Sequence, residues 1–133
     1  STQAKTLFPY TTLFRSIPID PSVISRDELA QDAYLNDEMV YHGPFRRETL
    51  EGLVSTVGRA QDGPGFGDQT LLWIHGTGDM LVPFDPTAEV IENLAGPNTE
   101  KHPYEEARHE LFHETNKDEV YTDVFNFIHR TIP

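Results

Sequence analysis

The strongest indication of the fold is the segment Leu71-Leu72-Trp73-Ile74-His75-Gly76-Thr77-Gly78-Asp79. It opens with a continuous apolar run and ends in a glycine-rich turn that carries a carboxylate. Such a run is typical of a strand buried on both faces of a parallel sheet. We therefore expect a strand over residues 70–74, with His75 at its end facing the turn and Asp79 on the loop that follows.

The sequence after this stretch predicts a helix, a strand and a second helix. Asp85 and Pro86 mark a helix start, because proline is tolerated in the first turn, and Gly96 marks the stop. Residues 99–105 are expected to form the next strand, and residues 116–130 an amphipathic terminal helix. Alternating strands and helices imply parallel pairing, so the predicted fold class is α/β.

Two further helices are predicted before the apolar run. Apolar residues at helical spacing predict an amphipathic helix over residues 46–60: Leu50, Leu53, Val54 and Val57. Ser25 and Glu28 have the spacing of a capping box, which predicts a short helix that ends near residue 33.

Asp79 and His109 form the candidate catalytic pair. His109 follows Asp79 by 30 residues and comes directly after the second predicted strand. A neutral imidazole is a good general base near pH 7, provided that a carboxylate fixes its tautomer and stabilises the imidazolium. Because the carboxyl ends of parallel strands meet at one edge, neighbouring strands would bring the two side chains together.

A nucleophilic serine to match this pair is missing from the printed sequence. No Gly-x-Ser-x-Gly occurs before Asp79, and Gly52, Ser55 and Gly58 have the wrong spacing. Residues 6–16 resemble the translation of a short-read sequencing adapter, and they contain no acidic residue. We therefore expect residues 1–16 to be a non-native leader, joined to coding sequence that is truncated at its 5′ side.

From Ile17 onward the chain resembles the carboxyl-terminal half of a monoacylglycerol-lipase-like serine hydrolase of the α/β-hydrolase superfamily. The resemblance lies in HGTGDMLVP and YEEARHELFHE, which match the Asp-bearing and His-bearing segments of the family, and in SRDELAQDAYLNDEMVYHG, which matches the mobile cap. In that family the Asp orients the His, and the His is the general base and acid. One departure is that a glycine often stands where Glu105 and Glu106 do.

The resemblance implies a division of the chain and a set of functional residues. Residues 17–60 would be a cap remnant with its exit helix, and residues 61–133 the carboxyl-terminal part of an incomplete hydrolase core. Leu81 and Val82 would border a lipid-like acyl pocket. The parent protein would hydrolyse acylglycerol-like esters through an acyl-serine intermediate without a cofactor, and this fragment would be inactive alone. A peptidase or lysophospholipase remains open within the superfamily.

A zinc peptidase is a rival interpretation from another class of enzyme. His109-Glu110-Leu111-Phe112-His113 satisfies H-E-x-x-H, in which two histidines one helical turn apart hold zinc and the glutamate is the general base. The motif requires a helix, and the helix predicted from residue 116 leaves little room for one. A noncatalytic interaction domain is a further alternative.

The composition argues against several kinds of partner and site. The formal net charge of −12 disfavours binding to nucleic acid, which requires basic patches. The absence of cysteine excludes disulfides and thiolate metal sites. No apolar stretch is long enough to span a membrane and no secretory leader is visible, so a cytoplasmic location is favoured. An incomplete fold would also expose an unpaired strand edge, so self-association is expected.

Overall fold

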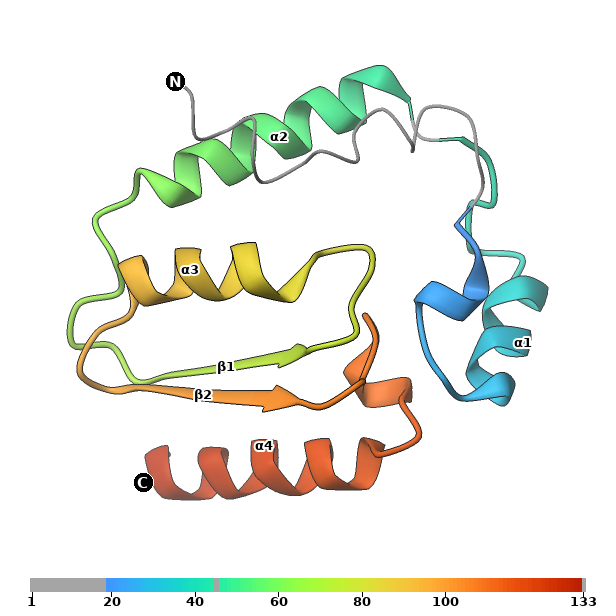
Figure 1. Ribbon diagram of the computed structural model, residues 1–133. Coiled ribbons are helices and arrows are strands. Elements are labelled where there is room, and N and C mark those ends of the chain that lie inside the picture. The colour runs from blue at the N-terminus through green and yellow to red at the C-terminus, as the bar shows by residue number, and fades with distance from the viewer. Residues whose placement is uncertain (1–18, 45, 133) are drawn as a thin grey trace.

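A pair of parallel strands forms the centre of the fold (Figure 1). The structure is a computed structural model that describes residues 19–44 and 46–132. Along the chain its elements are η3 (Pro21–Val23), α1 (Glu28–Asn36), α2 (Arg47–Gln61), β1 (Leu71–Gly76), α3 (Phe84–Leu94), β2 (Thr99–Tyr104), η4 (Leu111–His113) and α4 (Lys117–Thr131). The two strands and four α-helices expected from the sequence are thus present.

The β1 and β2 strands pair in parallel with α3 as the connection between them. The register runs from Leu71 opposite Thr99 to Gly76 opposite Tyr104. Both carboxyl ends therefore lie at the same edge of the sheet, which is where Asp79 and His109 follow.

Helices α3 and α4 cover opposite faces of the strand pair (Figure 1). Trp73 and His75 of β1 point to one side, where Trp73 stacks on Phe84 of α3 at a ring-centroid distance of 5.7 Å and His75 lies tilted to Phe84 at 5.9 Å. Ile74 points to the other side and packs against the main apolar cluster, which contains Val120 of α4. Alternating side chains of one strand thus hold a three-layer arrangement together.

The strand over residues 70–74 was predicted to be buried on both faces, but it is less buried than expected. Residues 71–75 are only half-buried. Within the described residues β1 pairs with β2 alone, so its other edge lacks a neighbouring strand. The apolar run has the composition of a central strand, but here it occupies an edge.

The predicted capping box is replaced by a different arrangement. Helix α1 begins at Glu28, and the side chain of Asp27 caps it by accepting from the amide of Leu29. The Ser25 hydroxyl instead accepts from the Asp27 amide and donates to the carbonyl of His113, 88 residues away. The Ser25 hydroxyl, which the sequence pattern predicted to cap α1, therefore makes a tertiary contact instead.

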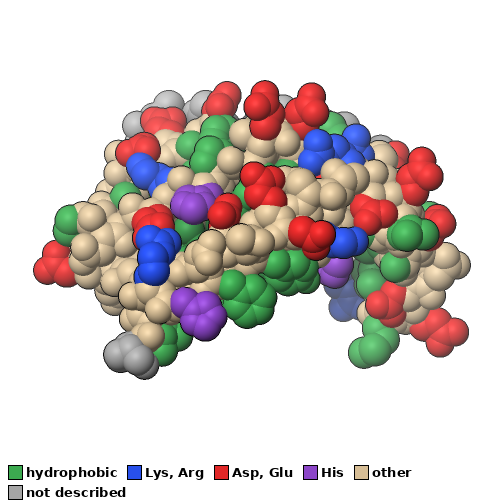
Figure 2. All heavy atoms as spheres, turned by 90° about the horizontal axis from the view of Figure 1, so that it is seen from below, with side chains coloured by type: hydrophobic (Ala, Val, Ile, Leu, Met, Phe, Trp, Pro, Cys, Tyr) green, Lys and Arg blue, Asp and Glu red, His purple; other side chains and the backbone are tan. Residues whose placement is uncertain are grey.

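Among the described residues, no helix is both long and apolar enough to cross a lipid bilayer. The face of the molecule in Figure 2 carries many acidic side chains, with hydrophobic side chains exposed between them.

Candidate active site

The loop after β1 and the loop after β2 are hydrogen-bonded to one another. The Thr77 amide donates to the Tyr104 carbonyl at 2.9 Å, and the Gly78 amide donates to the Ala107 carbonyl at 2.9 Å. In return, the Glu106 amide donates to the Thr77 hydroxyl at 2.9 Å. These bonds place the two predicted catalytic residues, which follow the two strands, against each other.

Glycine is required in the turn because the second loop passes so close to it. A Cβ at Gly78 would lie 2.6 Å from the Glu106 carbonyl oxygen, and a Cβ at Gly76 would lie 2.6 Å from the Arg108 oxygen. Both distances are shorter than van der Waals contact. The Gly-x-Gly of the opening sequence therefore permits the approach of the His-bearing loop.

The Asp79 carboxylate is held on both of its oxygens. Oδ1 accepts from the amides of Leu81 and Val82 at 2.8 and 2.9 Å, and Oδ2 lies 2.9 Å from Nδ1 of His109. Burial of the carboxylate alone would raise its pKa, but the hydrogen bonds from His109 and the two amides outweigh burial and hold the pKa of Asp79 below its usual value. Asp79 is therefore an anion near neutral pH.

His109 has the orientation that a general base needs. Its hydrogen bond to Asp79 raises its pKa against the opposing effect of burial, and the charges of Asp79 and Glu110 add to the increase. Because the carboxylate can only accept, Nδ1 carries the proton and Nε2 is the basic nitrogen. The His109 side chain is 41% exposed, so a reacting group can approach it.

His75 supports the same turn, a role that the sequence interpretation did not assign. Its Nε2 lies 2.8 Å from the Val82 carbonyl, to which it donates, and 3.6 Å from Oδ2 of Asp79. Since Val82 also donates its amide to Asp79, His75 braces the loop on which the carboxylate lies. This role could have been inferred from the alternation of side chains along β1, because it puts His75 on the same face as Trp73.

Leu81 and Val82, the predicted substrate-binding residues, lie next to the pair. Their amides bind Asp79, and both residues are half-buried. Their contact with an acyl chain stays a prediction.

The geometry does not suit the zinc motif. His109 lies in a loop, and only Leu111–His113 form a short 3-10 turn, so the helix that H-E-x-x-H requires is absent there. Glu110 binds Nδ1 of His113 at 2.9 Å, whereas Asp79 binds His109. Within residues 19–44 and 46–132, no group of three His, Asp or Glu side chains is arranged to hold a metal ion.

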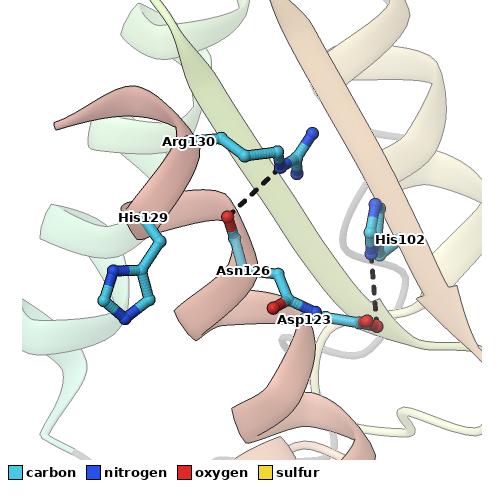
Figure 3. Close-up of a pocket in the computed structure, with 5 residues that line it drawn as sticks. All are labelled: His102, Asp123, Asn126, His129 and Arg130. Atoms are coloured by element: carbon cyan, nitrogen blue, oxygen red, sulfur yellow. Dashed lines mark hydrogen bonds and ion pairs between the residues drawn. The ribbon is translucent and has the colours of Figure 1, made fainter. Parts of the chain in front are cut away.

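An open hollow of about 440 Å³ lies elsewhere, between β2 and α4 (Figure 3). In it Asp123 lies 3.3 Å from Nδ1 of His102 and accepts from the Tyr104 hydroxyl at 2.9 Å. Arg130 binds Glu100 at 2.9 Å, and His129 points away from His102 (Figure 3). Asp123 is thus bonded to His102 and Tyr104, and none of the residues that line the hollow belongs to the Asp79–His109 pair.

The chain is similar in sequence to known hydrolases. The profile of a family described as serine aminopeptidase, S33 matches residues 3–116, a range that begins inside the predicted leader. The leader itself lies outside the described residues. Over 110 residues the chain is 26% identical to a monoacylglycerol lipase of Mycolicibacterium smegmatis. The matched region covers 83% of this chain and 39% of that enzyme.

Two solved structures have the same fold. The crystal structure of Paleococcus ferrophilus monoacylglycerol lipase matches with a TM-score of 0.68 at 19% identity, over 96% of this chain and 50% of that one. The second structure is a soluble variant of the Saccharomyces cerevisiae monoglyceride lipase in complex with a substrate analog. It matches with a TM-score of 0.73 at 15% identity, over 97% of this chain and 48% of that one. The chain therefore spans half or less of the length of these relatives.

These matches confirm the predicted α/β-hydrolase fold and the resemblance to monoacylglycerol lipases. Since the family profile matches most of the chain, the protein belongs to the serine aminopeptidase S33 family of hydrolases.

Proposed function

We propose that the protein is part of a serine ester hydrolase that acts on monoacylglycerol-like lipid esters, with Asp79 and His109 as its acid–base pair. The observation that carries the proposal is the 2.9 Å contact between Oδ2 of Asp79 and Nδ1 of His109. The two residues come from loops that follow neighbouring parallel strands, the position at which open α/β sheets bind their ligands. The relatives named above as monoacylglycerol lipases support the substrate class.

The reaction would use the pair in two half-reactions. Nε2 of His109 takes the proton of a serine hydroxyl as its oxygen attacks the ester carbonyl, and then returns the proton to the departing alcohol. Water, deprotonated by the same nitrogen, then attacks the acyl carbonyl carbon, and the proton passes to the serine oxygen as the acyl-serine bond breaks and the fatty acid leaves. Asp79 keeps Nδ1 protonated and stabilises the imidazolium in both steps.

The nucleophile is proposed to come from polypeptide beyond these 133 residues. No Gly-x-Ser-x-Gly is present, and within the described residues no serine is hydrogen-bonded to His109. Ser25 is buried and engaged with the His113 carbonyl. The chain alone would therefore be inactive as an esterase.

The acyl chain is proposed to lie beside the Asp79 turn. Leu81 and Val82 must lie beside the site because their amides bind its carboxylate. Met80, 53% exposed between Asp79 and Leu81, adds further apolar surface there.

Fluorophosphonate labelling tests the proposal directly. We expect no labelling of the pure chain, and labelling together with monoacylglycerol hydrolysis for a longer polypeptide that includes the coding sequence upstream of Ile17. In the longer polypeptide, His109→Ala should reduce kcat by about 10⁴-fold or more. Stoichiometric labelling of the present chain would contradict the proposal.

The family description makes peptide hydrolysis the second candidate. The same longer polypeptide should therefore be assayed with aminoacyl anilides as well as with monoacylglycerols. A kcat/KM that is higher for the anilides would replace the lipase assignment, but it would leave the roles of Asp79 and His109 intact.

A further inference from the structure

Glu114 is a fully buried carboxylate five residues beyond His109. Its Oε1 accepts from the amides of Arg108 and Arg26 at 2.8 and 3.0 Å, and its Oε2 accepts from Nε of Arg26 and the amide of Thr115, both at 2.9 Å. A buried anion is tolerated only when its lone pairs are satisfied in this way. Four such bonds on one side chain indicate a built structural centre.

These bonds connect two segments that are far apart in the sequence. One is the strap, residues 20–27, and the other is the His loop, residues 105–116. Further contacts join them: the Ser25 hydroxyl donates to the His113 carbonyl at 2.7 Å, the Glu110 amide donates to the Ile24 carbonyl at 2.9 Å, and the Arg108 guanidinium donates to the carbonyls of Ser22 and Ser25.

The contacts enclose His109 from both sides along the backbone. The residue before it, Arg108, donates its amide to Glu114, and the residue after it, Glu110, donates its amide to the strap. The imidazole itself is 41% exposed, and its hydrogen bond is to Asp79. Together with the bonds to the turn after β1, these backbone contacts therefore determine where the His loop holds the ring.

We propose that Glu114, with Arg26 and the strap, is the positioning centre that brings Nδ1 of His109 to Asp79. This inference rests on the proposed role of the Asp79–His109 pair. Glu114 is a positioning residue, since its contacts reach His109 through Arg108 and the strap. The strap leads directly into α1, in the part predicted to be a cap remnant, so the same contacts would also couple the cap to the geometry of the base.

NMR titration of His109 in the present chain tests the proposal, because the Asp79 contact raises the pKa of that imidazole. Glu114→Gln places an amide group against donors, so we expect it to lower the pKa of His109 toward the ordinary value and to weaken the downfield Nδ1 proton signal. Asp118→Asn is the matched control: it removes an exposed carboxylate in the first turn of α4 and should leave both signals unchanged.

Two milder variants keep the proposal testable if Glu114→Gln does not fold. Arg26→Lys keeps the charge but loses the Nε hydrogen bond, and Ser25→Ala removes the bridge to His113 while the carboxylate stays intact. Both should lower the pKa of His109 toward its ordinary value, relative to the unsubstituted chain. Folded variants with lowered melting temperature and an unchanged His109 titration would overturn the inference.

Asp79→Asn separates this inference from the proposed function. If Asp79→Asn leaves the His109 titration unchanged, the pair itself is not coupled and the proposed function fails. If Asp79→Asn lowers the pKa but the Glu114, Arg26 and Ser25 variants do not, only the positioning inference fails.

Discussion

The side chains of Asp79 and His109 each move the pKa of the other. Hydrogen bonding to Asp79 raises the pKa of His109, and the bonds from His109, Val82 and Leu81 overcome burial to lower the pKa of Asp79. Between these two pKa values the pair is an ion pair with one partner buried. The stability of the fold should therefore depend on pH through this pair.

Asp79→Asn is expected to destabilise the chain more at pH 5.5 than at pH 9. A raised histidine pKa contributes stability that is fully present below the unfolded-state value and is lost as pH rises through the folded-state value. The depressed carboxyl pKa contributes stability that is lost only as pH falls through the folded value of Asp79. Asn keeps an acceptor for the Leu81 and Val82 amides, so urea unfolding at the two pH values measures mainly the charge effect.

Glu110→Gln serves as the comparison for that experiment. Glu110 acts on His109 only through its charge, the smallest of the causes that raise the pKa. Its removal should therefore change the pH dependence much less than Asp79→Asn does. Equal pH profiles for the two variants would mean that the hydrogen bond contributes little.

Glu106 is held in the left-handed backbone region, with φ of 56°. This conformation costs a non-glycine residue about 1–2 kcal/mol, because the left-handed region brings the Cβ close to the following carbonyl oxygen. We expect Glu106→Gly to give a chain about 1 kcal/mol more stable than Glu105→Gly, since only the first relieves strain. Thermal unfolding of both variants checks this; a less stable Glu106→Gly would show that the strain is small.

At the scale of elements, the turn after β1 determines how closely the His loop can approach. We expect Gly76→Ala to destabilise the chain by about 1–3 kcal/mol, because its Cβ would overlap the backbone of Ala107 and Arg108. Gly52→Ala is the matched control. Gly52 lies inside α2, and among residues 19–44 and 46–132 no atom outside the neighbouring helix backbone lies within 4 Å of the new Cβ, so alanine there should stabilise by up to about 1 kcal/mol. Urea unfolding should therefore separate the two substitutions in sign.

The positions of the elements were predictable because each has a local cause. Helix α2 follows from the spacing of Leu50, Leu53, Val54 and Val57, and β1 follows from an unbroken apolar run. The hydrogen bond from the Ser25 hydroxyl to the His113 carbonyl was not predictable in the same way. This hydroxyl has both a local partner and a distant one, and only the folded chain places the His113 carbonyl within 2.7 Å.

At the scale of the whole molecule, β1 has one edge without a neighbouring strand among the described residues, and large apolar side chains are exposed. Around α1 these include Leu29 at 78% and Met39 at 94% exposure. Exposed strand edges and apolar patches favour association. We expect the chain to sediment as concentration-dependent oligomers in analytical ultracentrifugation.

Met39→Lys should weaken this association more than Asn36→Lys does. Both substitutions add one positive charge at exposed positions close together in the sequence, but only the first removes apolar surface. A monodisperse monomer at all concentrations would contradict the prediction and would count against an incomplete fold.

Local patterns in the sequence predict the order of strands and helices, the glycine turn, and Asp79 and His109 as the candidate pair. Each of these depends on neighbouring residues or on a short motif, so a local pattern reveals it. The tertiary structure decided that Nδ1 of His109 faces Asp79, that His75 braces the turn, and that Glu114 joins the strap to the His loop. The contacts of Glu114 with the strap cross 88 residues, and such contacts form only when the parallel strands bring separate loops to one edge.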